Sequence, residues 1–190
     1  MTALREAVQG CRGCLLYANA TQAVFGEGRL TAEVMLVGEQ PGDQEDLAGA
    51  PFVGPAGKLL DQALEEAGVN RRTTYVTNAV KHFKWKARGT RRIHDKPTWT
   101  EAMACRPWLD AELALVKPRA LVLMGATAAQ ALFGKGFKVT QDRGKPLDSE
   151  LADLVVATIH PSAVLRAENR DEMFAGLVDD LRVVSRTFAA

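Results

Sequence analysis

His94 ends a basic segment and carries a side chain suited to covalent chemistry. Residues 81–96 contain seven of the 24 lysines and arginines and a single acid, Asp95, although the chain has a net charge of only +1. Phe83 and Trp85 lie within the segment, so cations for a phosphate backbone alternate with rings on which bases can stack. The imidazole at its end can act as a nucleophile or proton carrier near neutral pH. A solvated basic loop with an incidental histidine is the alternative interpretation.

Three cysteines offer a second kind of chemistry. Cys11 and Cys14 are separated by two residues, which places two thiolates on one tight turn, and Cys105 lies far along the chain. An odd number of cysteines in a protein expected to be cytoplasmic argues against a disulfide framework. The pair is compatible with a metal or cluster site or with a redox dithiol, although no predicted strand precedes it as in thioredoxin-like motifs.

Length and composition predict a single domain spanning residues 1–190. Apolar residues make up 47% of the chain and charged residues 25%, which is the balance of soluble globular proteins. The N-terminus lacks the apolar run of a secretory signal, and no segment offers the roughly 18 apolar residues that a membrane span requires. We therefore expect a cytoplasmic monomer that has no membrane partner.

Alternating strands and helices predict an α/β fold. Four short and almost entirely apolar runs are typical of parallel strands buried on both faces: Val34–Gly38, Thr74–Ala79, Ala120–Met124 and Leu154–Ile159. Helical patterns cover about Ala56–Ala67, Thr100–Val116, Ala126–Leu132 and Asp171–Arg186. The expected architecture is a three-layer α/β/α sandwich around a central four-stranded parallel sheet.

Polar residues follow the predicted strands at the edge where such folds bind ligands. Glu39-Gln-Pro-Gly42 follows the first strand, Asn78 ends the second, Gly125-Ala-Thr127 follows the third and His160-Pro-Ser162 follows the fourth. Ligands of open parallel sheets bind beyond the carboxyl ends of the strands. The sequence therefore predicts a binding or catalytic site at this edge.

The residue types at this edge suit a flat heterocycle. The Asn78 amide offers one acceptor and one donor face, the complement of an imide edge such as that of uracil. His160 could donate to a developing oxyanion, Phe52 could stack on a ring, Glu39 could orient a water or an imidazole, and Gly42 leaves room. Each also has a structural interpretation: a capping amide, a core histidine, a core phenylalanine, a surface carboxylate and a turn.

Together these motifs resemble those of uracil-DNA glycosylases. The similarity to bacterial iron–sulfur members lies in four motifs: Gly38-Glu-Gln-Pro-Gly42, Pro51-Phe-Val-Gly-Pro-Ala-Gly57, Thr77-Asn-Ala-Val80 and His160-Pro-Ser162. The loop Arg91-Arg-Ile-His94 resembles that of the X-type branch, whose members become covalently attached to uracil-containing DNA. The similarity runs in order from about Cys11 to Leu181.

The resemblance implies roles for the matching residues. Phe52 would stack on a flipped uracil, Asn78 would read its edge and His160 would stabilise the departing anion at O2. Other residues at the reacting nucleotide would be Glu39 and Gln40 near C1′, with Gln40, Gly42 and Asp43 lining the uracil site. Contacts to single- or double-stranded DNA would come from Lys81, Lys84, Arg88, Arg91, Arg92 and Ser162. Val164 and Leu165 would wedge into the duplex, unless they are ordinary apolar residues of a helix start.

The resemblance also implies a cofactor. Cys11, Cys14 and Cys105 match three ligands of a 4Fe–4S cluster, and His82 replaces the usual fourth cysteine. Three thiolates and one imidazole also form a common structural zinc site, so donor chemistry alone leaves both open.

One mechanism follows from these roles as a hypothesis. Neutral His94 captures the sugar cation as uracil departs, Glu39 removes the remaining imidazole proton, and the adduct persists, so each protein reacts once and releases one free uracil. The alternatives are a conventional multiple-turnover uracil-DNA glycosylase, in which His94 only positions other groups, and a non-catalytic module that binds uracil or single strands.

Overall fold

The computed structural model describes residues 1–188, so residues 189 and 190 of the predicted domain lie outside the described part. Its centre is a five-stranded sheet in the order β2-β1-β5-β7-β6. The strands are β1 (Val34–Gly38), β2 (Thr74–Asn78), β5 (Ala120–Met124), β6 (Pro146–Leu147) and β7 (Leu154–Thr158). The strands β2, β1, β5 and β7 are parallel, as predicted, and all their residues are buried. The predicted four-stranded sheet needs one correction, because β6 adds an antiparallel edge.

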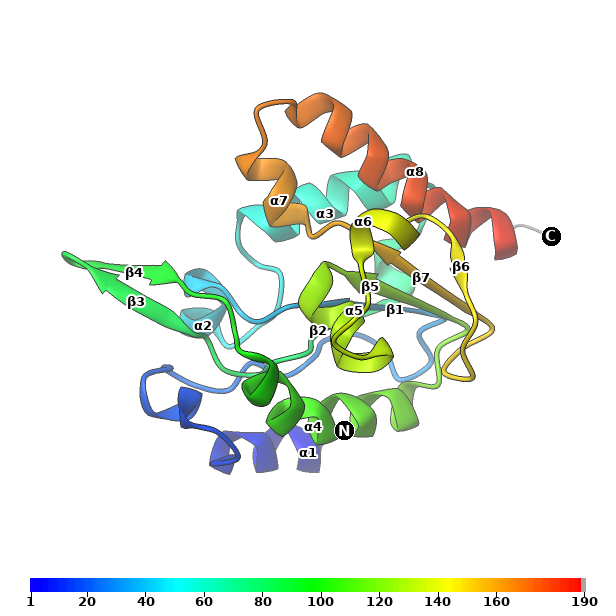
Figure 1. The fold of residues 1–190 in the computed structure, drawn as a ribbon. Coiled ribbons are helices and arrows are strands. Elements are labelled where there is room, and N and C mark those ends of the chain that lie inside the picture. The colour runs from blue at the N-terminus through cyan, green and yellow to red at the C-terminus, as the bar shows by residue number, and fades with distance from the viewer. Residues whose placement is uncertain (189–190) are drawn as a thin grey trace.

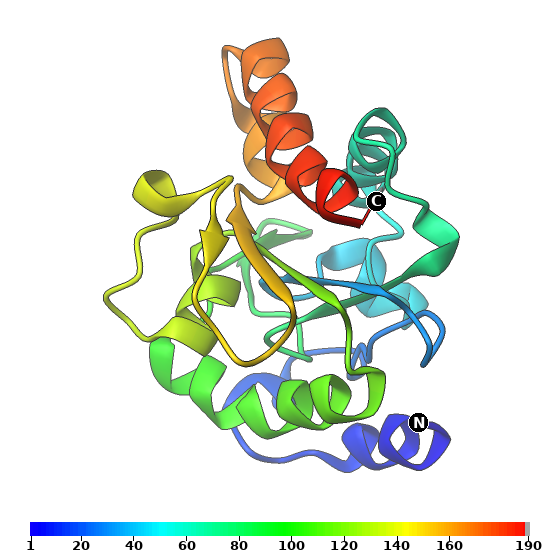
Figure 2. The ribbon, with the colours of Figure 1, turned by 90° about the vertical axis from the view of Figure 1, so that its right-hand side faces the viewer.

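Helices cover both faces of the sheet and complete the three layers (Figure 1). One face packs against α3 (Pro55–Glu66), α7 (Pro161–Arg166) and α8 (Arg170–Phe188). The other packs against α4 (Trp99–Val116), α5 (Ala126–Phe133) and the short α6 (Val139–Asp142). Figure 2 shows the sheet edge-on between these layers. The predicted α/β/α sandwich is confirmed.

Local sequence signals account for the helix starts nearest the functional edge. Pro55 and Pro161 occupy the first positions of α3 and α7, where a missing N–H costs nothing. Thr98 and Glu101 form a capping box at the start of α4. The remaining short elements are α1 (Thr2–Ala7), η1 (Val8–Gly10), η2 (Leu15–Ala18), α2 (Asp43–Ala48) and η3 (Arg71–Thr73). No helix within residues 1–188 is long and apolar enough to cross a membrane.

The basic segment forms a separate two-stranded hairpin rather than a loop. Strands β3 (Trp85–Arg88) and β4 (Arg91–His94) pair antiparallel, with Trp85 opposite His94. The hairpin projects from the body of the molecule beside α2 (Figure 1). His94 therefore lies at its base, next to the domain, while the turn between the strands lies at the far end.

The sheet order fixes where a ligand can bind. β2 lies on one side of β1 and β5 lies on the other, so the direction of winding reverses between β1 and β5. The loops that follow these two strands diverge and leave a crevice at the carboxyl ends. Glu39 follows β1 and Thr127 follows β5 closely, which places both at this reversal.

Candidate active site

A pocket of about 420 Å³ opens at the carboxyl edge of the sheet. Most residues predicted for the site line it: Glu39, Gln40, Gly42, Asp43, Phe52, Asn78, His94, His160, Ser162 and Leu165. They come from the end of β2, the segments that follow β1 and β7, the helices α2 and α7, the loop before α3 and the base of the hairpin. The volume lies within the range of small-molecule sites, and residues far apart in the sequence form one cavity.

Asn78 presents an unused acceptor to this pocket. Its side chain is buried, and Oδ1 has no hydrogen-bond partner among residues 1–188. Its main-chain carbonyl accepts a 2.7 Å hydrogen bond from Lys81 Nζ, which holds the backbone. A buried acceptor without a partner is costly, so Oδ1 remains available to a donor from a ligand or from solvent.

Gly38 allows three side chains to converge, and the sequence analysis gave it no role of its own. A Cβ at this position would overlap Asn78 Oδ1 and would lie 2.7 Å from Phe52 Cζ and 3.3 Å from His160 Nε2. Phe52 has a φ of 58°, in the left-handed region that is uncommon outside glycine. Its ring stacks with that of His160 at 6.1 Å between centroids. Strained non-glycine backbone of this kind concentrates at functional sites.

His94 reaches the pocket and pairs with Glu39. The distance between His94 Nε2 and Glu39 Oε1 is 3.2 Å, and Thr127 Oγ1 donates a short hydrogen bond to Glu39 Oε2. Burial alone would raise the pKa of Glu39, but the hydrogen bonds from His94 and Thr127 and the charges of His94 and His160 outweigh it and lower that pKa. Glu39 is therefore held as a carboxylate that orients the imidazole. Thr127 lay in the Gly125-Ala-Thr127 motif, but its contact with Glu39 was not predicted.

His160 directs its ring nitrogen Nε2 toward Gly38, where Asn78 and Phe52 also converge. Its Nδ1 accepts the backbone N–H of Ser162 at 3.1 Å, so in the neutral ring the proton belongs to Nε2. Nε2 is the atom that a Cβ on Gly38 would approach. The site therefore holds a neutral imidazole as a hydrogen-bond donor, alongside the acceptor of Asn78.

Acid should destabilise the protein through His160. Burial, helped by the charges of His94 and Arg166 and opposed by that of Glu39, lowers the pKa of His160 to about 4. In the unfolded chain the His160 imidazole has a pKa near 6.5 and takes up a proton at a higher pH than in the folded protein. Stability that is present above pH 6.5 is therefore lost as the pH falls toward 4. Between pH 7 and pH 4.5 the free energy of unfolding should fall by about 2 kcal/mol more in the wild type than in His160→Gln. Urea denaturation at both pH values measures this, and equal losses would contradict it.

Gln40 anchors the hairpin through its side-chain amide. Its Nε2 donates to the carbonyls of Lys84 and Asp95 at 3.1 and 3.0 Å, and its Oε1 accepts from Lys84 N at 3.0 Å. These bonds close the open end of the hairpin beside His94. Gln40 also lines the pocket, so its predicted catalytic and uracil-binding roles stay predictions, beside an observed contact that fixes the position of the hairpin.

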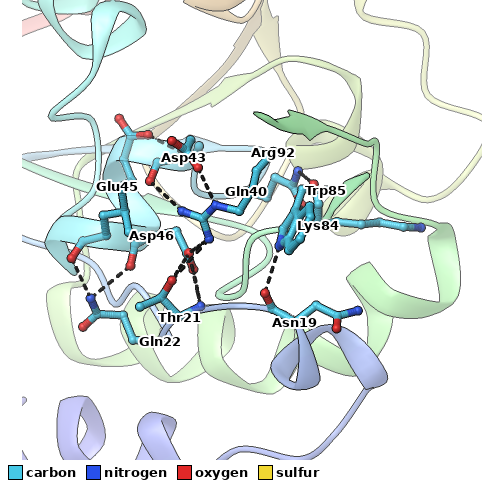
Figure 3. A network of polar contacts seen from close by, with 12 residues as sticks. Asn19, Thr21, Gln22, Gln40, Asp43, Glu45, Asp46, Lys84, Trp85 and Arg92 are labelled. Carbon is cyan, nitrogen blue, oxygen red and sulfur yellow. Dashed lines mark hydrogen bonds and ion pairs between the residues drawn. The ribbon is translucent and has the colours of Figure 1, made fainter. Parts of the chain in front are cut away.

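Arg92 also makes structural contacts, which join the hairpin to α2 (Figure 3). Its guanidinium pairs with Asp43 at 2.7 Å and with Asp46 at 2.5 Å, and it lies over the rings of Phe83 and Trp85. These contacts tie the hairpin to α2. The predicted phosphate contact of Arg92 is corrected, because its charge is already neutralised. Asp43 lines the pocket but points its carboxylate at Arg92 rather than at a ligand.

Three further expectations fail because the side chains are buried. Lys81 is fully buried and pairs with Glu112, so it cannot contact DNA. Phe83 is 1% exposed and cannot stack on a base, and Val164 belongs to the hydrophobic core instead of wedging into a duplex. Leu165 lines the pocket, so its role stays a prediction.

The remaining DNA-binding predictions concern side chains at the surface or at the pocket. Arg88 and Arg91 are exposed and form no ion pair within the described part of the chain. Lys84 is largely buried and pairs with Glu101 at 2.9 Å. Ser162 lines the pocket beside His160. The free cations of the hairpin therefore lie toward its outer end.

Residues 25–182 match the family model of the uracil DNA glycosylase superfamily. The chain belongs to the uracil-DNA glycosylase superfamily. Over 172 residues it is 38% identical to a type-4 uracil-DNA glycosylase of Thermotoga maritima, covering 90% of this chain and 86% of that protein. A type-4 uracil-DNA glycosylase of Pyrobaculum aerophilum is 38% identical over 170 residues, covering 86% and 83%. A type-5 uracil-DNA glycosylase of the same organism is 34% identical over 120 residues, covering 55% and 50%.

Membership in the uracil-DNA glycosylase superfamily confirms the family that the motifs predicted. The matched segment contains every residue of the pocket and Cys105, whereas Cys11 and Cys14 precede it. The names of these relatives do not distinguish an X-type branch, so that finer assignment stays a prediction.

The four predicted metal ligands of this uracil-DNA glycosylase lie in or beside a buried region between the N-terminal segment and α4. Cys14 and Cys105 belong to one hydrophobic cluster, and His82 is 4% exposed. Lys81 N donates to Cys105 Sγ at 3.2 Å, and Trp108 Nε1 donates to Cys11 Sγ at 3.2 Å. Within residues 1–188, no three His, Cys, Asp or Glu side chains converge closely enough to hold a single metal ion.

Proposed function

We propose that this protein removes uracil from DNA and that His94 then bonds covalently to the exposed sugar. The observation that carries the proposal is the contact between His94 and Glu39 in a pocket that also holds Asn78 and His160. Side chains that would read the base, donate to an oxyanion and attack the sugar thus line the same cavity. Superfamily membership supports the glycosylase part of the proposal.

Uracil fits the hydrogen-bonding pattern of the pocket. The unpaired Oδ1 of Asn78 would accept the N3–H of uracil, and the amide NH₂ would donate to O4. Cytosine has the opposite pattern at these positions and would leave buried groups unpaired. Phe52 would stack on the flipped base, which requires the target nucleotide to leave the helix.

Breaking the glycosidic bond produces a uracil anion and a sugar cation. Two residues of the site would stabilise these charges. The electron pair of the C1′–N1 bond leaves with uracil, whose O2 would accept a hydrogen bond from Nε2–H of His160. The sugar becomes an oxocarbenium cation, which the carboxylate of Glu39 stabilises electrostatically. His160 keeps its proton, because it acts as a hydrogen-bond donor to the anion.

Capture requires one imidazole nitrogen to attack C1′. His94 donates one N–H to Glu39, so its other nitrogen carries the lone pair that forms the new bond. The alkylated ring is cationic until its remaining proton passes to Glu39. The neutral N-glycosyl imidazole that results is a poor leaving group, and the adduct therefore persists.

A conventional glycosylase is the second candidate, and the names of the type-4 relatives favour it. In that case Glu39 would orient a water that attacks C1′, and His94 would hold Glu39 in place. Mixing the protein with a tenfold excess of a uracil-containing oligonucleotide separates the two. Covalent capture gives a denaturant-resistant band and free uracil that both stop at one per protein, whereas continued uracil release without the band identifies turnover. A thymine oligonucleotide of the same sequence is the control.

We extend the proposal to a 4Fe–4S cluster held by Cys11, Cys14, His82 and Cys105. Burial raises the pKa of the Cys105 thiol to about 11, and a bound metal would replace the proton that this thiol otherwise keeps. Three thiolates and one imidazole suit either a zinc ion or an iron–sulfur cluster, and the resemblance of the motifs to iron–sulfur members favours the cluster. When bound, the cluster would join the N-terminal segment to α4. Iron analysis and visible absorption test it against zinc.

Arg91 should contribute to DNA affinity through charge alone. Its exposed guanidinium lies on the hairpin that ends at His94. Arg91→Ala should weaken binding of all sequences and lower the slope of log K against log salt by roughly one. Fluorescence anisotropy across salt concentrations measures the slope, with exposed Arg186→Ala on α8 as the control. A slope equal to that of the wild type would show that Arg91 does not contact phosphate.

A further inference from the structure

Glu45 links two loops of the active site, although the sequence analysis assigned it no role. It lies in the first turn of α2 and is 8% exposed. Its Oε2 accepts the N–H of Gly42 at 3.0 Å, and its Oε1 accepts the N–H of Gly54 at 2.7 Å. One buried carboxylate thus satisfies backbone donors in two separate segments.

The two segments carry different parts of the pocket. The first follows β1 and contains Glu39, which contacts His94. The second precedes α3 and contains Phe52, whose backbone is held at a φ of 58°. Such a backbone conformation persists only where surrounding contacts enforce it. The bond from Gly54 N to Glu45 lies two residues from Phe52 and supplies one such contact.

The two loops and the carboxylate fit one another closely. A Cβ on Gly42 would lie 2.6 Å from Glu45 Oε2, and a Cβ on Gly54 would lie 2.9 Å from Glu45 Oε1. Both glycines therefore let the backbone approach the carboxylate. A glutamine at position 45 keeps the size of the side chain but has only one acceptor oxygen, so it can serve only one of the two loops.

We propose that Glu45 is a positioning residue that sets the distance between Phe52 and two other pocket residues, Asn78 and Glu39. This role rests on the proposed function, because Phe52 acts there by stacking on uracil. Glu45 lines the pocket, but each of its carboxylate oxygens accepts a hydrogen bond from a backbone amide. It therefore works through the loops rather than on the reacting bond.

A double-mutant cycle tests this role. Glu45→Gln should slow single-turnover uracil release about 10- to 100-fold in the native background. In a Phe52→Ala background the same change should cost less than about threefold, because the ring that Glu45 positions is absent. Exposed Glu65→Gln on α3 is the control. An equal loss in both backgrounds would overturn the proposal, since a general loss of stability acts without regard to Phe52.

Hydrogen exchange gives a readout that does not depend on activity. In Glu45→Gln the amides of residues 40–44 or 52–56 should exchange faster than in the wild type, while residues 61–66 of α3 exchange unchanged. Unaltered exchange in both loops would overturn the role of Glu45. A wild-type protein that neither releases uracil nor bonds to DNA would contradict the proposed function instead, and the exchange result would still decide whether Glu45 holds the loops.

Discussion

Replacing His94 with serine should abolish the covalent product while uracil is still released. Serine lacks the ring nitrogen that attacks C1′, so the yield of the denaturant-resistant band should fall by more than roughly 10³-fold. The smaller side chain leaves space beside Glu39 for a water, which would complete the reaction by hydrolysis. Gel electrophoresis with labelled DNA measures the band, and chromatography of the small-molecule fraction measures uracil.

Ile93→Ser is the matched control for this change. Ile93 precedes His94 on β4 and is 42% exposed, so the substitution alters the same strand without removing the nucleophile. This variant should retain the band at the level of the wild type. A persistent band in His94→Ser, with full yield, would place the attachment elsewhere and would leave His94 as a positioning group.

Asn78→Ala should remove both the reaction and its selectivity for uracil. The change deletes the buried acceptor at Oδ1 and the donor beside it. Sites built to hydrogen-bond a polar group discriminate strongly when that group is absent, so we expect kcat/KM for uracil release to fall by roughly 10³-fold or more. The residual rates for uracil and cytosine should become similar.

Single-turnover assays on matched uracil and cytosine oligonucleotides measure this loss of preference. Asn70→Ala is the control, because Asn70 is exposed and lies beyond the opposite end of β2. Its activity should remain that of the wild type. If Asn78→Ala kept the original preference for uracil over cytosine, the amide would not be the group that reads the base.

Nearly continuous apolar runs were sufficient to predict the four parallel strands of the main sheet. The four buried strands stand out because every residue of each is covered on both faces, and their predicted ends differ from the observed ones by at most one residue. β6 contains only Pro146–Leu147, which is too short to stand out as an apolar run. The polar residues after the strands were predictable because parallel strands bring their carboxyl ends to one edge.

Contacts between distant residues were not predictable from the sequence. Lys81 belongs to a basic run, but its partner Glu112 lies on α4, and only folding brings them together. Arg92 is neutralised in the same way by Asp46 of α2. The importance of Gly38 depends on three side chains from other segments that meet at its Cα. The sequence therefore indicated where the site lies. Which of its charged side chains remain unpaired depends on ion pairs that form only in the folded protein.

Mass spectrometry of the digested adduct tests most directly whether His94 bonds to C1′ of the sugar. Protease and nuclease treatment should leave one abasic nucleotide on the peptide that contains His94, with fragment ions placing the added mass on that residue. The yield should not exceed one adduct per protein. Added mass on another residue, or several uracils released per protein with every peptide unmodified, would contradict the account.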